Sequence, residues 1–142
     1  MVFNMPHATV KWVGNRKFVG GDRLGHEHIM EAHRNYGGLG EGTTPMDMFL
    51  IALGGCAGID IVTMLEARGQ AIKRFEVAID GKRREQHPRF FSKISLKFTL
   101  GGDLKEDVVD HVISLTMRKV CPIAGILSQI SDMDWSFEIV PA

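Results

Sequence analysis

The feature that most constrains the fold is a long apolar stretch, residues 43–69, which reads TTPMDMFLIALGGCAGIDIVTMLEARG. Thr44, Pro45 and Asp47 are typical of a helix start, since they supply an N-cap, a first-turn proline and an acidic group near free amides. Gly69 is typical of a helix end. Apolar residues occur almost all the way round this helix, which would be about 36 Å long at about 1.5 Å per residue. We therefore expect the rest of the chain to surround it.

Cys56 lies near the middle of this helix and comes directly after Gly54 and Gly55. Glycines weaken a helix, so this pair predicts that another element approaches the helix backbone closely. The apolar run of residues 48–59 is shorter than the roughly 20 residues that cross a membrane, and Asp60 places a charge directly after it. The stretch therefore indicates a buried helix of a soluble protein.

The bulk composition favours one soluble domain, residues 1–142. A chain of 142 residues that is 44% hydrophobic and 24% charged can bury a substantial core. Its formal net charge is zero, so it lacks the basic excess expected of proteins that bind nucleic acid or acidic membranes. The N-terminus lacks the basic flank and long apolar segment of a signal peptide. We expect a cytoplasmic protein.

The part of the chain before the helix has short strand-like runs separated by turn residues. Residues 8–13, 17–19 and 26–32 predict a small antiparallel meander. Asn15 and Arg16 lie at its first turn. Residues 33–44 are expected to form a loop that leads into the helix.

The part after the helix begins with alternating apolar residues, which predict a hairpin of residues 74–81 and 90–100 with an exposed basic connection. We then expect a helix that is capped by residues 101–103 and ends near Val120, a short helix of residues 122–130, and a last strand of residues 133–141. This order predicts an α+β fold with antiparallel sheets around the central helix.

The two cysteines, Cys56 and Cys121, are 65 positions apart and belong to no Cys-x-x-Cys motif. They are too few for a disulfide scaffold or a cysteine-rich zinc site, so they are either inert core residues or a reacting pair. Cys121 precedes Pro122 at an expected helix N-terminus, where amides and the helix dipole favour thiolate. Cys56 has no such local help, so an arginine must lie beside it if it reacts.

Four motifs carry a resemblance to a known family: Gly42-Thr43-Thr44-Pro45, Ala52-Leu53-Gly54-Gly55-Cys56, Asp60, and Val120-Cys121-Pro122. In this order and spacing, the chain resembles the family of osmotically inducible protein C (OsmC) and organic hydroperoxide resistance protein. It most resembles the YhfA-like branch, in which Pro-Met-[Asp/Glu] and Gly-Gly-Cys replace the Pro-Glu and Ala-Ala-Cys of the peroxidases.

The resemblance implies an intertwined homodimer with two sites at the subunit interface, and a thiol peroxidase that reduces organic hydroperoxides in the oxidative stress response. On that pattern Cys56 attacks the peroxide and becomes a sulfenic acid, and Cys121 resolves it as a disulfide. An external dithiol then restores the pair. No metal or bound cofactor is implied, because sulfur carries the redox change. His26 and His28 share a strand face, but no third ligand accompanies them.

The resemblance also implies that an arginine from the N-terminal strands stabilises the Cys56 thiolate. Arg16 is at about the matching place, and Arg23 and Arg34 are alternatives. In the peroxidases a glutamate after the motif proline pairs with this arginine, whereas this chain has Met46. The substitution favours an alternative function, a non-catalytic dimer that binds a small apolar or thiol ligand in the interface pocket.

Two carboxylates lie close to these motifs. Asp47 is one residue past Met46, about 100° round the helix, where it completes the capping box. Asp60 lies one turn past Cys56 on the same helix face. It is either an interface hydrogen-bonding group or a replacement acid.

Overall fold

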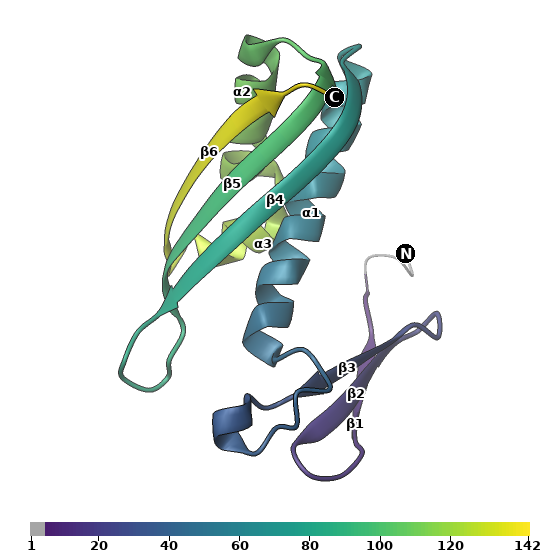
Figure 1. Ribbon diagram of the computed structural model, residues 1–142, viewed down its shortest axis with the longest axis vertical. Helices are drawn as coiled ribbons and strands as arrows, with labels where there is room; N and C mark the ends of the chain where they lie inside the picture. The colour runs from purple at the N-terminus through teal and green to yellow at the C-terminus, as the bar shows by residue number, and fades with distance from the viewer. Residues whose placement is uncertain (1–4) are drawn as a thin grey trace. The chain divides into compact units, whose positions relative to one another are not determined.

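The computed structural model describes residues 5–142, which form two compact units that divide between Phe49 and Leu50 (Figure 1). The first unit holds a three-stranded sheet and the first turn of the long helix. The second unit holds the rest of that helix, a second three-stranded sheet and shorter helices. The expected α+β fold class is confirmed.

The first unit contains strands β1 (Ala8–Trp12), β2 (Lys17–Asp22) and β3 (Glu27–Glu31), which pair antiparallel in that order. This confirms the predicted meander. Its first turn contains Asn15, whose backbone is left-handed with φ of 50°. The loop expected after β3 also contains a single 3-10 turn, η2 (Arg34–Tyr36).

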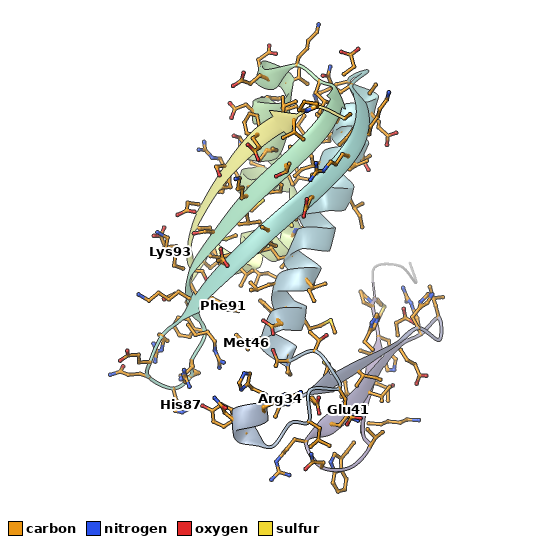
Figure 2. The ribbon with its side chains drawn as sticks, viewed as in Figure 1. Arg34, Glu41, Met46, His87, Phe91 and Lys93 are labelled. Carbon is orange, nitrogen blue, oxygen red and sulfur yellow. The ribbon has the colours of Figure 1, made fainter. Side chains whose placement is uncertain are left out.

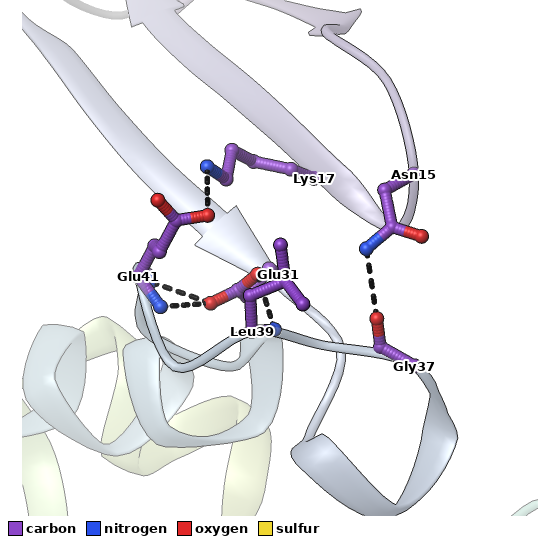
Figure 3. A network of polar contacts seen from close by, with 7 residues as sticks. Asn15, Lys17, Glu31, Gly37, Leu39 and Glu41 are labelled. Atoms are coloured by element: carbon purple, nitrogen blue, oxygen red, sulfur yellow. Dashed lines mark hydrogen bonds and ion pairs between the residues drawn. The ribbon is translucent and has the colours of Figure 1, made fainter.

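A buried carboxylate organises the loop that leads into the long helix (Figure 3). Glu31, only 2% exposed, accepts hydrogen bonds from the amides of Leu39 at 3.1 Å, of Gly42 at 2.8 Å and of Glu41. The side chain of Glu41 in turn pairs with Lys17 at 2.7 Å. The hydrogen bond from the Leu39 amide is the largest of several causes that lower the pKa of the Glu31 carboxyl. Together these causes outweigh the desolvation of the carboxylate, which acts in the opposite direction.

Helix α1 (Pro45–Ala67) begins and ends as predicted. The Asp47 amide donates to Thr44 Oγ1 at 3.2 Å, and Thr44 Oγ1 donates to the Asp47 carboxylate at 2.9 Å. Gly69 has the left-handed φ of 72° that ends many helices.

The expectation that the chain encloses α1 is wrong. Only 33% of its most apolar window is buried, and Ile51 and Ile59 are 59% and 70% exposed. The apolar character continues past Asp60, so α1 meets the length and composition criteria of a membrane span, which core helices of soluble proteins also meet. The sequence pattern shows that α1 is apolar on all of its faces. It does not show which of those faces pack against the rest of the same chain.

The second unit is built on strands β4 (Ala71–Arg83), β5 (Phe91–Asp103) and β6 (Asp132–Val140). β4 and β5 form the predicted hairpin. β6 pairs parallel to β5 rather than antiparallel, because the chain crosses back along the sheet through helices before the last strand. The helices of this unit lie on one face of the sheet in Figure 1. The buried side chains of β5 alternate as expected: Ile94, Leu96, Phe98 and Leu100.

The crossover consists of α2 (Glu106–Leu115), one π-helical turn, η3 (Thr116–Val120), and α3 (Pro122–Leu127). The helix cap predicted at residues 101–103 is wrong, because these residues belong to β5 and still pair with β4. The N-cap is Lys105, whose amide is held by the side chain of Gln70 at 2.8 Å. α3 is also shorter than predicted.

Glycines allow α1 to lie close to β4, as the sequence predicted. A Cβ atom at Gly54 would lie 3.0 Å from Ile79 Cδ1, and one at Gly58 would lie 3.2 Å from Phe75 Cε1. A Cβ atom at Gly55 would meet no atom within 4 Å. The close approach therefore involves Gly54 but not Gly55.

We expect Gly58→Val to lower the free energy of unfolding by about 1–3 kcal/mol, because the new side chain would overlap the Phe75 ring. Phe75 has little freedom to move, since it packs on Phe98 with ring centroids 6.0 Å apart. Chemical denaturation measures the effect, and Gly125→Val, on α3 where an added Cβ atom would meet no atom within 4 Å, is the matched control. Equal losses in the two variants would contradict this packing.

We expect Glu31→Gln to lower the unfolding midpoint at pH 7, because an amide accepts fewer of the loop's backbone hydrogen bonds than a carboxylate does. The folded-state pKa of Glu31 is lowered, so its stabilisation is fully present above its ordinary value of 4.5 and is lost as the pH falls through the folded value. The gap between wild type and variant should therefore narrow in acid. A gap that is constant between pH 7 and about pH 3 would contradict this account.

Candidate functional site

Three reactive side chains of the second unit converge in space: Cys56, Asp60 and Cys121. Their two Sγ atoms and a carboxylate oxygen all lie within 4.8 Å of one another. Cys56 and Asp60 come from α1, and Cys121 comes from the start of α3. The fold thus brings together two sulfurs that are 65 positions apart in the sequence.

Helix geometry places Cys56 and Asp60 together. They are four residues apart, so their side chains lie one above the other on α1. They flank the buried face, which includes Leu53 and Ala57, and both are half-buried. This face of the helix is therefore anchored in the core while the Cys56 thiol and the Asp60 carboxylate stay accessible.

The π-helical turn before α3 sets the position of Cys121. Its closing hydrogen bond runs from the Cys121 amide to the Thr116 carbonyl at 2.9 Å. As predicted, Cys121 is the N-cap of α3, and its Sγ accepts a hydrogen bond from the Ala124 amide at 3.4 Å. Cys121 is 3% exposed, so it is much less accessible than Cys56.

The protonation state expected for Cys121 from the sequence is wrong. Burial raises the pKa of its thiol to about 11, although the amides of Ala124 and Ile123 lower it, and the neighbouring Cys56 raises it further. A six-residue helix does not overcome the loss of hydration at this sulfur. Cys121 is therefore a neutral thiol at pH 7.

Both cysteines are free thiols in the structure. Their proximity favours a disulfide after oxidation of either sulfur, and the nearby carboxylate can accept a proton or bind a cation. The fold therefore brings the two cysteines together, as a reacting pair requires.

The arginines considered from the sequence all belong to the first unit. Arg16 Nη1 donates to the Asn15 carbonyl at 3.4 Å, and its side chain lines an apolar groove together with Phe18 and Met30. Arg23 donates to the Met5 carbonyl at 3.0 Å. The guanidinium of Arg34 lies over Gly40. A role for Arg16 beside Cys56 stays a prediction.

Met46 occupies the first turn of α1, half-buried, where the peroxidase pattern has a glutamate (Figure 2). A thioether holds no guanidinium. The carboxylate of the neighbouring Asp47 accepts a hydrogen bond from Thr44 within the helix cap. This confirms the capping role predicted for Asp47.

The sequence left two roles open for Asp60, an interface hydrogen-bonding group or a replacement acid. Its four-residue spacing from Cys56 was the available signal, and it placed both side chains on one face. The approach of Cys121 to that same face depends on the crossover and could not be predicted from local sequence.

His26, considered as a metal ligand, instead pairs with Asp22 at 2.8 Å.

Comparisons with known proteins agree on one family. The family model described as OsmC-like protein matches residues 38–136. Protein YhfA of Escherichia coli (strain K12) is 35% identical over 136 residues, which are 95% of this chain and 98% of that protein.

Solved structures show the same fold. A hypothetical protein from Aquifex aeolicus VF5 matches with a TM-score of 0.87 and 22% identity, over 97% of this chain and 98% of that one. An organic hydroperoxide resistance protein OsmC from Legionella pneumophila matches with a TM-score of 0.75 and 16% identity, over 94% and 96%. The expected fold is confirmed by these likenesses.

Proposed function

The chain belongs to the OsmC-like protein family, and we propose that it is a thiol peroxidase that reduces organic hydroperoxides through Cys56 and Cys121. The observation that supports this most is the approach of the two sulfurs within 4.8 Å. The similar Legionella pneumophila protein is named for organic hydroperoxide resistance. The single domain of residues 1–142 and a cytoplasmic location are part of the same proposal.

The proposed cycle balances in three steps. The Cys56 thiolate attacks the peroxide oxygen, so that an S–O bond forms, the O–O bond breaks, and the alkoxide leaves as an alcohol after taking up a proton. The Cys121 thiol then condenses with the Cys56 sulfenic acid, forming the disulfide and releasing water. An external dithiol reduces the disulfide and is itself oxidised to a disulfide.

The exposure of the two sulfurs supports this division of roles. Cys56 is half-buried on an accessible edge of α1, where a peroxide can reach it. Cys121 is buried and within reach of Cys56, as a resolving cysteine must be. Its neutral thiol at pH 7 also avoids a second negative charge next to the attacking thiolate.

A cation near Cys56 is the remaining requirement, and Arg16 is the proposed source. Without the motif glutamate, Arg16 would be less firmly oriented than in the peroxidases, because Met46 provides no acceptor. Slower oxidation of Cys56 in Arg16→Ala than in Arg23→Ala and Arg34→Ala would support this assignment.

A homodimer would cover the apolar residues that a single chain leaves exposed. On α1 these include Ile51 and Ile59, and in the first sheet Val10 and Trp12 are 55% and 66% exposed. A three-stranded sheet needs a hydrophobic face packed against another surface to be stable. A second copy of the chain, with the sites at the interface, would bury these residues.

We expect the wild-type protein to sediment as a dimer. Ile59→Lys should shift it towards monomer, because the variant places a charge on an exposed apolar position of α1. Asp110→Lys, on the exposed side of α2, is the control. A monomeric wild type, or equal dissociation of both variants, would contradict the homodimer.

We expect cumene hydroperoxide to oxidise two thiols per chain in the reduced protein and to form the Cys56–Cys121 disulfide, identified by peptide mass spectrometry. Cys56→Ser should lose hydroperoxide turnover. Cys121→Ser should stop after one turnover with a sulfenic acid at Cys56, trapped by dimedone. Turnover in Cys56→Ser, or wild-type protein with both thiols intact, would contradict the peroxidase proposal.

The second candidate is a non-catalytic dimer that binds a small apolar or thiol ligand. It is favoured by Met46 and by a groove of about 570 Å³ in the first unit, whose lining includes Val10, Phe18 and Met30 with the cation of Arg16. Intact thiols in the hydroperoxide experiment, together with saturable binding of an apolar fluorescent probe that Phe18→Asp abolishes, would favour this candidate.

A further inference from the structure

The cluster of Cys56, Asp60 and Cys121 has the composition of a metal site as well as that of a redox pair. We propose that the reduced protein binds one zinc-class divalent ion through Cys56 Sγ, Cys121 Sγ and a carboxylate oxygen of Asp60. The proposal requires only that both thiols are reduced, and so it stands independently of the peroxidase cycle. The family resemblance implied no metal, because sulfur carries the redox change, and the sequence was weighed for cysteine-rich and histidine sites but not for a mixed one.

The distances fit a tetrahedral ion after small side-chain adjustments. Zinc binds sulfur at about 2.3 Å and carboxylate oxygen at about 2.0–2.2 Å, so two of its ligand atoms lie roughly 3.5–3.8 Å apart. The three donor atoms here lie within 4.8 Å of one another. Shifts of at most about 1 Å therefore bring all three to bonding distance.

The Asp60 carboxylate is the observation that points to a cation. It is half-buried next to two thiols, and among residues 5–142 it takes part in no ion pair and accepts no side-chain or backbone hydrogen bond. A half-buried carboxylate without a partner is unfavourable, because part of its hydration is lost and nothing replaces it. A bound cation would supply the missing partner.

The donor set selects the class of ion. Two thiolates favour zinc and similar borderline ions over magnesium and calcium, which prefer oxygen ligands. Three protein ligands leave the fourth position of a tetrahedral ion for water or a small thiol. Cys56 and Asp60 are only half-buried, so within one chain the cluster is open on their side.

Binding balances without a redox change. The ion displaces the protons of the Cys56 and Cys121 thiols, forms two metal–sulfur bonds and one bond to the ionised Asp60, and releases two protons to solvent. A disulfide leaves no thiolate to bind the ion, and the disulfide can form only when the ion is released. Metal binding and oxidation of the pair therefore exclude one another.

The test uses the reduced full chain without oxygen or hydroperoxide. Cobalt(II) should bind one per chain and give the thiolate-to-metal absorption and visible bands of a tetrahedral thiolate site. Zinc should displace it and compete with a chromophoric chelator. Asp60→Asn should lower the affinity for zinc by at least about 10-fold. The Asp110→Asn variant, whose substitution lies on the exposed side of α2, should bind zinc as tightly as wild type.

Two further samples separate loss of the site from loss of the fold. Asp60→Glu retains a carboxylate and should recover part of the affinity, and wild-type protein oxidised to the disulfide should bind no zinc. The proposal is overturned if reduced wild type shows no cobalt–thiolate absorption, or if Asp60→Asn binds zinc as tightly as wild type. Peroxidase activity is assayed separately with chelator present, so either function can fail alone.

Discussion

The close packing of α1 against β4 is the contact on which the site depends. Gly54 and Gly58 bring the helix backbone to within contact distance of side chains on β4, while Leu53 and Ala57 fill the core beside them. This fixes the rotation of α1 about its axis. Cys56 is thereby held at the edge of the buried face, where the crossover helices bring Cys121 to it.

Local signals in the sequence were sufficient for most of the elements. The cap of Thr44 and Asp47, the alternation along β5 and the position of Cys121 before Pro122 each depend on a few neighbouring residues. The parallel pairing of β6 and the N-cap of α2 at Lys105 were missed, because they depend on the path of the crossover and on Gln70, 35 residues away.

Two properties of the site depend on burial, which local sequence does not give. The helix N-terminus at Cys121 indicated a thiolate, but this sulfur is almost fully buried, and desolvation has the larger effect. The apolar surface of α1 indicated an enclosed helix, yet Ile59 is exposed. Both differences have the same origin: the pattern reveals the character of a side chain but not what covers it.

The charge of the cluster connects its two proposed chemistries. A thiolate at Cys56 and a carboxylate at Asp60 would be two like charges within 4.8 Å, and an added cation would offset their repulsion. An arginine would stabilise one thiolate without bonding to it, whereas a metal ion would hold both sulfurs as ligands. A metal that binds the dithiol but not the disulfide makes oxidation less favourable. By linkage, oxidation weakens metal binding by the same free energy. If both proposals hold, the identity of the cation that binds beside Asp60 would decide which of the two chemistries the cysteine pair performs.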